Sequence, residues 1–286
     1  GYDIFKEAKV RRFWAAQPNS TLRPKLFQRL YPDIPGLHRN NTSFLSAFFR
    51  ENLSNVDAVD YSHAVRWRNG RRNGRFLNKE IQRETDLNNA EAIKKQLPSR
   101  FNAWDPLARA QYLEIKIFLS QYLLSSQGDR VSMANSIEGR FPFLDHRMVA
   151  YCNQLPAHLK LRGLTEKYLL KKLGRKWLPE EIWKRPKRPY RAPIHRSFFN
   201  KFAPDYVREL LSPEQLKANG LFNPIAVGQL VQRIQQNRPV SESEDMAVAG
   251  ILSTQLVHSH FVSNFHKHSP DSRWHGVKVC RGSHLA

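Results

Sequence analysis

The sequence predicts a mainly α-helical protein. Helix-capping residues recur along the chain, apolar residues recur at helical spacing between them, and alternating runs typical of strands are scarce. The chain has 286 residues, of which 41% are hydrophobic, so we expect a packed core. No apolar stretch reaches the roughly 18 residues of a membrane-spanning helix, which excludes an ordinary transmembrane segment.

The first half of the chain predicts short helices separated by turns. The first helix covers residues 3–16, with Asp3 as its candidate N-cap. Prolines then divide the chain, and a helix is expected around residues 22–31. Residues 43–52 begin with a serine cap and have an amphipathic pattern. The Arg-rich run over residues 67–74 contains two Asn-Gly pairs and is predicted to be a surface loop.

The clearest helix start is Asp105 followed by Pro106, because aspartate is a preferred N-cap and proline fits the first helical position. This helix is expected to bury one face, which carries Leu113, Ile117 and Leu124. A second helix is predicted over residues 129–137.

Further caps predict the remaining helices. Asp145 is expected to begin a helix that stops at Pro156, and Thr165 is expected to cap the helix TEKYLLKKLGRKW. Residues 179–184 open with proline and form a short helix. Ser241 and Glu244 have the spacing of a capping box. The last helix then carries Ala249, Leu252 and Leu256 toward the core.

The charge of the chain requires a partner or another explanation. There are 46 Lys and Arg residues against 25 Asp and Glu, a net charge of +21. Nucleic acid, an anionic membrane surface and a polyphosphate such as ATP are all compatible with this excess, as is simple solubility of a helical protein. The two cysteines cannot form a disulfide framework, so a reducing, cytoplasmic setting is expected.

The densest basic region covers residues 160–191, where twelve Lys and Arg residues stand against three Glu. Lys167 lies in the first turn of the helix predicted after Thr165, and a helix N-terminus attracts anions. Lys187 lies among three prolines, which favour a stiff extended loop able to hold a cation over a phosphate. Taken alone, Lys167 is explained more simply as a solvated lysine. The loop around Lys187 is likewise explained more simply as a Pro-rich connector with a basic surface.

Two other groups of charges are candidates for binding. Glu138 and Arg140 precede the apolar run FPFL, so we expect them to be partly buried and either paired with each other or facing a ligand. An Arg cluster could bind phosphodiesters, although a solvated insertion explains it as well. The members of this cluster are Arg66, Arg68, Arg71, Arg72 and Arg75.

The histidines near the C-terminus are read as the composition of a polar tail. They are His258, His260, His266, His268, His275 and His284. Because no Cys or carboxylate lies in register with them, no metal site is predicted.

Three segments together resemble a known family. DRVSMANSIEGRFPFLDHR, LPAHLKLRGLTEKYLLKK and LPEEIWKRPKRP, in this order over residues 119–193, resemble the C-terminal part of glutamine-hydrolysing asparagine synthetases. Gly1-Tyr2 also resembles the end of the family's acidic signature. The resemblance implies that residues 1–262 are the helical C-terminal portion of an α/β PP-loop ATP-pyrophosphatase domain of the adenine nucleotide alpha hydrolase type. Its parallel sheet would be largely missing.

Two stretches resemble the family less closely. Residues 54–91 are expected to be an insertion. Residues 263–286 are expected to be a disordered, His-rich tail.

The resemblance implies ATP-dependent conversion of aspartate to asparagine through β-aspartyl-AMP, with Mg²⁺ and with ammonia released from glutamine. It implies that Lys187 is catalytic and stabilises the phosphoryl transition state and the departing pyrophosphate. Lys167 is implied to contact the phosphates. Glu138 and Arg140 are implied to shape the wall of the site.

Several family features are absent from the sequence, including the Ser-Gly-Gly-x-Asp-Ser loop for pyrophosphate and a glutaminase cysteine near the start. We therefore expect a partial chain that is inactive alone, with the glutaminase, the nucleotide-binding strands and the Mg²⁺ ligands outside it. A cytoplasmic protein is expected, and a homodimer stays open.

Two alternatives remain. One is a related synthetase that forms an amide or lactam on another carboxylate. The other is a basic helical module that binds nucleic acid, which is disfavoured because it explains neither Lys167 nor Lys187.

Overall fold

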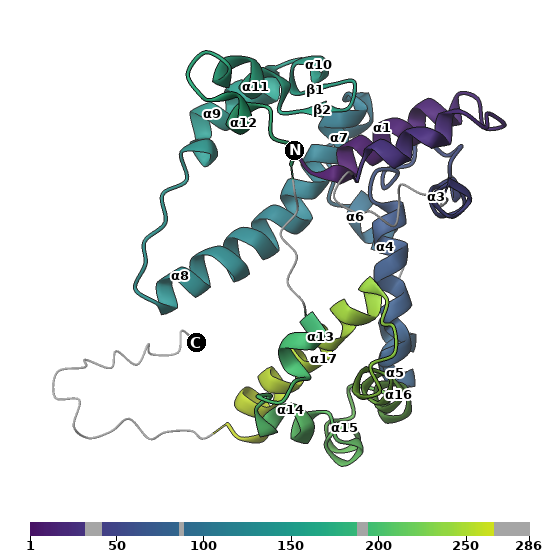
Figure 1. Ribbon diagram of the computed structural model, residues 1–286, viewed down its shortest axis with the longest axis vertical. Coiled ribbons are helices and arrows are strands. Elements are labelled where there is room, and N and C mark those ends of the chain that lie inside the picture. Colours follow the sequence, from purple (N-terminus) through teal and green to yellow (C-terminus); the bar gives the residue numbers. More distant parts are fainter. Residues whose placement is uncertain (32–41, 86–88, 188–193, 266–286) are drawn as a thin grey trace, which may run out of the picture. The chain divides into compact units, whose positions relative to one another are not determined.

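The computed structural model describes residues 1–31, 42–85, 89–187 and 194–265 (Figure 1). The described part is mainly helical, as the sequence predicts, and its only sheet is a two-stranded antiparallel hairpin. The chain divides into two compact units. Unit 1 comprises Gly1–Arg72 with Asp86–Arg191, and unit 2 comprises Asn73–Thr85 with Ala192–Ala286. Among the described helices, none combines the length and apolar composition that crossing a bilayer requires.

The elements of unit 1 are short helices and the hairpin. Those before the hairpin are α1 (Asp3–Ala15), η1 (Arg23–Arg29), α3 (Thr42–Arg50), α4 (Ala64–Arg71), α6 (Asn89–Lys94), η3 (Phe101–Ala103), α7 (Pro106–Leu113), the π-helical η4 (Glu114–Asp129), α8 (Arg130–Ala134), η5 (Pro142–Leu144), α9 (His146–Gln154) and α10 (Ala157–Lys160). The hairpin strands are β1 (Leu161–Arg162) and β2 (Thr165–Glu166), followed by α11 (Tyr168–Gly174) and α12 (Glu180–Trp183).

Aromatic packing holds α1 against η1 and α3. Trp14, Phe27 and Phe49 are all buried, and the rings of Phe27 and Phe49 are stacked with centroids 4.1 Å apart. Trp14 meets Phe27 edge to face. Such ring pairs add to the stabilisation that burial of their apolar area provides. The predicted N-cap of α1 is wrong, because Asp3 lies inside the first turn and pairs with Lys6, while Tyr2 is the N-cap.

Arg11 is buried in the same unit and joins α1 to two later segments. Its side chain is 1% exposed. Its guanidinium donates to the carbonyls of Tyr61 at 2.7 Å, Glu51 at 2.8 Å and Phe49 at 3.2 Å. It also lies over the ring of Tyr61, 4.3 Å from the centroid. Burial lowers the pKa of Arg11, and the carbonyl contacts compensate the charge for lost hydration.

The predicted helix after Asp105 is confirmed at its start and corrected beyond it. The Asp105 carboxylate accepts from the backbone N–H of Leu107, and Pro106 is the first helical residue. From Glu114 onward the helix is π-helical, and only Leu113 of the predicted apolar face is fully buried. The buried residue of this stretch is Glu114, whose carboxylate meets His63 at 3.0 Å and Arg66 at 3.4 Å.

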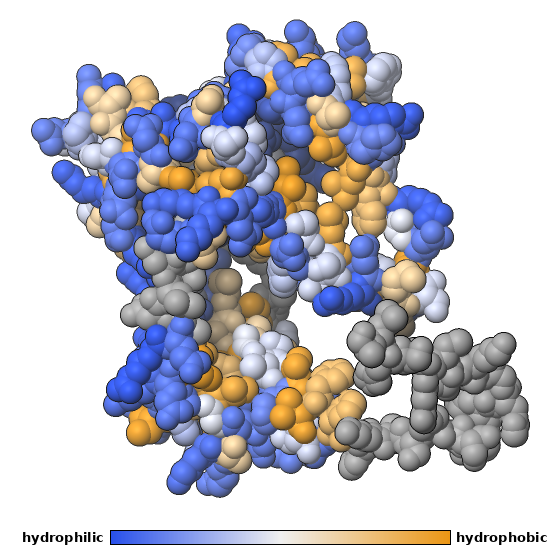
Figure 2. Space-filling view, turned by 180° about the vertical axis from the view of Figure 1, so that it is seen from behind, coloured by the Kyte–Doolittle hydropathy of each residue, from blue (hydrophilic) through white to orange (hydrophobic). Residues whose placement is uncertain are grey.

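Large apolar side chains are exposed along unit 1 from Ile115 to Ile182. They include Tyr122, Val131, Met133, Ile137, Phe141, Phe143, Met148, Tyr151, Leu170 and Trp177. Figure 2 shows hydrophobic residues among the hydrophilic ones at the surface. So many exposed apolar side chains are more than isolated surface residues account for, and are typical of elements that pack against other protein.

Unit 2 encloses a separate hydrophobic core. Its elements are η2 (Arg72–Phe76), α5 (Lys79–Thr85), α13 (Ile194–Phe198), α14 (Asp205–Leu210), α15 (Pro213–Asn219), α16 (Pro224–Gln235), α17 (Glu242–His258) and η6 (Ser259–Ser263). Leu216, Val227 and Leu252 are among its most buried residues. The N–H of Asn78 donates to Leu221 and that of Asn223 to Phe76, which ties Asn73–Thr85 to the rest of this unit.

The predicted capping box at the start of α17 is confirmed. Glu244 Oε1 also accepts hydrogen bonds from the guanidinium groups of Arg75 and Arg233, each at 2.7 Å. Burial alone would raise the pKa of Glu244, but hydrogen bonds from Arg233, Ser241 and Arg75 lower it to about 2. The Glu244 carboxylate therefore stays charged and links η2, through Arg75, to α16 and α17.

Two further expectations are corrected. The run over residues 67–74 is not a loop, because α4 extends to Arg71 and η2 follows it directly. His258 and His260 belong to α17 and η6 and not to a polar tail. The other four histidines of that group lie outside the described residues.

Candidate functional site

The hairpin places the basic region on a packed support. Leu161 of β1 is buried with Ile4, Phe5 and Ala110, so the hairpin is anchored on α1 and α7. Arg162 pairs with Thr165 and Leu161 with Glu166. The turn contains Gly163 at φ +57°, a left-handed conformation that glycine adopts without steric cost. The end of β2 is thereby fixed.

Glu166, at the end of β2, gathers two lysines around one carboxylate oxygen. Its Oε1 accepts from Lys171 Nζ at 3.1 Å and from the backbone N–H of Lys187 at 3.1 Å. The residue is 7% exposed. Burial tends to raise the pKa of Glu166, but its own backbone N–H, Lys171 and Lys187 together lower it. An ionised carboxylate therefore lies between two segments of the basic region.

Lys167 lies next to this carboxylate, but not where the sequence predicts. Thr165 belongs to β2 and does not cap a helix, and Lys167 precedes α11 with φ +52°. A left-handed conformation costs a side chain with a Cβ on the order of 1 kcal/mol. The backbone of Lys167 is therefore strained, and glycine would adopt this conformation at lower cost.

The side chain of Lys167 lies against Gly1. A methyl group placed on Gly1 would come within 2.8 Å of Lys167 Cε. The structure places both lysines at the same carboxylate: Lys167 directly follows Glu166 in the chain, and Lys187, 20 positions after Lys167, donates its backbone N–H to Glu166. Anions are favoured at such a place.

Glu138 and Arg140 form an ion pair at 2.5 Å, so the predicted pairing is found. The expected partial burial is wrong, because their side chains are 73% and 75% exposed. The following Phe141 and Phe143 are also exposed and do not cover the pair. No described contact joins either residue to the lysines around Glu166. That Glu138 and Arg140 shape the wall of a binding site stays a prediction.

Three members of the Arg cluster are paired with carboxylates of their own units. Arg66 meets Glu114, Arg68 pairs with Glu51 and donates to the carbonyl of Phe48, and Arg75 meets Glu244. These side chains have structural roles in folded units. The cluster therefore offers a phosphodiester less free charge than the sequence suggests.

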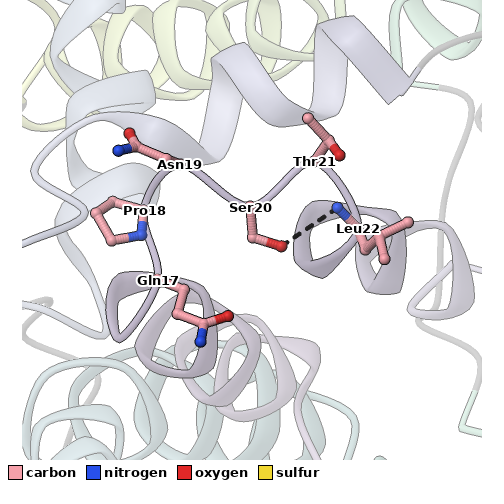
Figure 3. Close-up of a pocket in the computed structure, with 6 residues that line it drawn as sticks. All are labelled: Gln17, Pro18, Asn19, Ser20, Thr21 and Leu22. Carbon is pink, nitrogen blue, oxygen red and sulfur yellow. Dashed lines mark hydrogen bonds between the residues drawn. The ribbon is translucent and has the colours of Figure 1, made fainter.

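A surface hollow lies away from the lysines, in the turn between α1 and η1 (Figure 3). It is lined by consecutive residues from Gln17 to Leu22, and the hydroxyl of Ser20 accepts from the N–H of Leu22. Since no charged side chain lines it, the hollow lacks the chemistry for binding phosphate. Among the described residues, no three His, Cys, Asp or Glu side chains are placed to hold a metal ion.

Sequence reasoning missed Glu166 and Lys171 as members of the site. Both were visible only as parts of a basic stretch. The one local signal is their separation of five positions across the start of α11, which is not specific. The contact with Lys187 depends on the hairpin and cannot be read from spacing.

Comparison with known proteins gives a family match over most of the chain. The family model described as asparagine synthase matches residues 1–259. Over 141 residues, the chain is 32% identical to amidase chyE of Penicillium rubens, covering 46% of this chain and 20% of that protein. No solved structure gives a significant match.

Two other relatives are named as synthetases. Over 91 residues, the chain is 37% identical to a putative asparagine synthetase (glutamine-hydrolyzing) of Mycobacterium tuberculosis, covering 32% of this chain and 14% of the relative. Over 145 residues, it is 28% identical to asparagine synthetase (glutamine-hydrolyzing) 1 of Bacillus subtilis, covering 45% and 23%. The matched segments thus span at most 23% of these three relatives.

Proposed function

Because this chain belongs to the asparagine synthase family, we propose that it is part of an enzyme that uses ATP to convert aspartate to asparagine. The observation that carries the proposal is the placement of Lys167 and Lys187 around Glu166 within the family-matched region. In this proposal the substrates are ATP, aspartate, and ammonia or glutamine. A glutaminase portion, a nucleotide-binding portion and the ligands for Mg²⁺ would lie outside the chain. Mg²⁺, when bound, would neutralise phosphate charge.

The proposed reaction has two steps. An oxygen of the aspartate side chain forms a bond to the α-phosphorus of ATP, and the bond from that phosphorus to pyrophosphate breaks. Ammonia then forms a bond to the activated carbonyl carbon and loses a proton, and AMP leaves. Lys187 would stabilise the charge on the transferring phosphoryl group and on departing pyrophosphate, and Lys167 would contact the phosphates. Fixed cations lower such a barrier because their positions need no reorganisation.

The exposed apolar side chains between Ile115 and Ile182 support a role as part of a larger protein. Exposed apolar side chains are stabilised when they pack against other protein. We propose that the remainder of the same enzyme covers these side chains. A cytoplasmic location and a homodimer stay predictions.

The chain by itself is expected to give no aspartate-dependent ATP–pyrophosphate exchange above the blank, whereas the full-length protein is expected to give it. The physical reason is that the lysines supply only part of the charge compensation that pyrophosphate release needs. The measurement is incorporation of labelled pyrophosphate into ATP with and without aspartate. Clear pyrophosphate exchange by the chain alone would contradict the proposal that part of the active site lies outside the chain. Absence of exchange in the full-length protein with every carboxylate tested would contradict the synthetase function.

A second function has one observation in its favour, which is that the Penicillium relative is named an amidase and not an asparagine synthetase, so names within the matches differ in the reaction they state. We therefore keep an amide-forming or lactam-forming enzyme with another carboxylate as the alternative. Exchange that depends on a different carboxylate and not on aspartate would select it.

Replacement of Lys167 by Gly is expected to separate stability from activity. Glycine relieves the left-handed strain at this position, so the melting temperature should stay the same or rise by about 1–3 °C. Exchange by the full-length protein should fall by at least about tenfold, because a phosphate-contacting charge is lost. Thermal unfolding and the exchange assay measure the two effects.

The matched control is Lys172→Gly, which removes an exposed lysine from inside α11. It should lower stability by about 1 kcal/mol, as glycine does within a helix, and leave exchange nearly unchanged. Full activity of Lys167→Gly would remove Lys167 from the proposed site.

A further inference from the structure

Lys187 is held in place through its backbone by a residue from another segment. Its N–H donates to Glu166 Oε1 at 3.1 Å, and Glu166 lies 21 positions earlier in the chain. Lys187 itself follows α12 in a stretch without helix or strand. A residue in such a stretch has many accessible backbone conformations, and a long-range hydrogen bond reduces them. Glu166 therefore restricts where Lys187 can lie.

Glu166 is suited to this task because it belongs to the anchored hairpin. Its backbone is paired with Leu161, which is buried against α1 and α7. Its carboxylate is shielded from water and also receives Lys171 Nζ, whose side chain is 18% exposed. A buried carboxylate needs such partners to offset its lost hydration. The position of the acceptor oxygen is thus fixed by the hairpin on one side and by Lys171 on the other.

We propose that Glu166 is a positioning residue for the proposed phosphoryl-transfer reaction: its carboxylate oxygen holds the backbone of Lys187 at the end of β2, which directly precedes Lys167 in the chain, and so restricts where the Lys187 ammonium can lie. Lys171 neutralises the carboxylate, so that Glu166 does not cancel the positive field that the other two lysines offer to phosphate. This inference rests on the function proposed above, because Lys187 must itself act on the phosphates.

The chemistry gives two substitutions with opposite predictions. Glu166→Gln keeps the length of the side chain and an oxygen that accepts from Lys187, but removes the charge. Glu166→Asp keeps the charge but is shorter by one methylene, so its carboxylate cannot reach Lys187 from the same backbone position. A positioning role predicts that the Asp variant is the more damaged of the two. A role of the charge alone predicts the reverse.

The test measures kcat and the KM for ATP in aspartate-dependent ATP–pyrophosphate exchange by the full-length protein. We expect Glu166→Asp to lower kcat by about 10–100-fold with KM changed by less than about threefold, because misplacement of a transition-state contact affects kcat. Glu166→Gln should lower kcat by less than about fivefold. Glu180→Gln is the control, since Glu180 is an exposed carboxylate that pairs with Lys184 at 2.8 Å. It should match the unmodified protein.

A double substitution shows whether Glu166 acts through Lys187. When Glu166→Asp is combined with Lys187→Ala, kcat should be no lower than with Lys187→Ala alone, because the group being positioned is gone. Additive losses would overturn the inference, as would equal kcat for Glu166→Asp and the unmodified protein, or a Gln variant more damaged than the Asp variant. Full exchange by Lys187→Ala would instead contradict the role proposed for Lys187, so the two failures are distinguishable.

Discussion

Replacing Lys187 by Ala in the full-length protein is expected to lower adenylate formation by about 10²–10³-fold, to a slow but measurable rate, while glutamine hydrolysis is retained. Loss of one preorganised contact to a phosphoryl transition state costs on the order of 10²–10³ in rate. Since the backbone N–H of Lys187 remains, its hydrogen bond to Glu166 persists and the loop keeps this anchor. Exchange of pyrophosphate measures the first activity, and release of glutamate from glutamine measures the second.

The control for this prediction is Lys184→Ala. Lys184 lies three residues earlier on the same segment, is exposed and pairs with Glu180. Its removal takes away the same charge from the same basic region, and an exposed pair of this kind contributes little to stability. The rate of ATP–pyrophosphate exchange in Lys184→Ala should differ from that of the unmodified protein by less than about twofold. Near-normal exchange in Lys187→Ala would take Lys187 out of the catalytic step.

Helix starts were predictable from sequence because their chemistry is local. Asp105 and Asp145 each accept from a backbone N–H two residues later, and Ser241 with Glu244 forms the predicted capping box. These contacts need only a few neighbouring residues and a free N–H at the helix end. They therefore appear in the sequence pattern before any tertiary contact is known.

The errors arise where tertiary contacts decide. The Arg-rich run was predicted to be a loop from its Asn-Gly pairs, yet arginine is a good helix former and Arg66 and Arg68 find partners on other elements. Similarly, Thr165 is a favourable cap in isolation but is taken into the hairpin opposite Arg162. Local propensity is a weak prior where pairing and burial compete with it.

The site was predictable in part. Lys167 and Lys187 were selected through the family resemblance, and the structure places Lys167 directly after Glu166 and the backbone N–H of Lys187 on its carboxylate. The carboxylate that joins their segments was not selected, because its partner is 21 positions away. The burial expected for Glu138 and Arg140 rested on neighbouring apolar residues, which are themselves exposed in the described chain.

Replacing Arg11 by Met is expected to destabilise the protein by about 3–5 kcal/mol. Methionine fills much of the same space, but the carbonyls of the buried Phe49 and Tyr61 lose their donors, and so does that of the exposed Glu51. Each buried acceptor without a partner costs about 1–3 kcal/mol. Thermal unfolding followed by circular dichroism should show a melting temperature lower by on the order of 10 °C.

Arg29→Met is the matched control, since Arg29 is exposed at the end of η1 in the same unit. The same atoms are exchanged, but no buried acceptor depends on them, so stability should change by less than about 0.5 kcal/mol. A difference between the two variants therefore measures the carbonyl contacts and not the loss of one positive charge. If Arg11→Met melts within about 1 °C of the unmodified protein, water has replaced the guanidinium, and Arg11 does not hold α1 to α3.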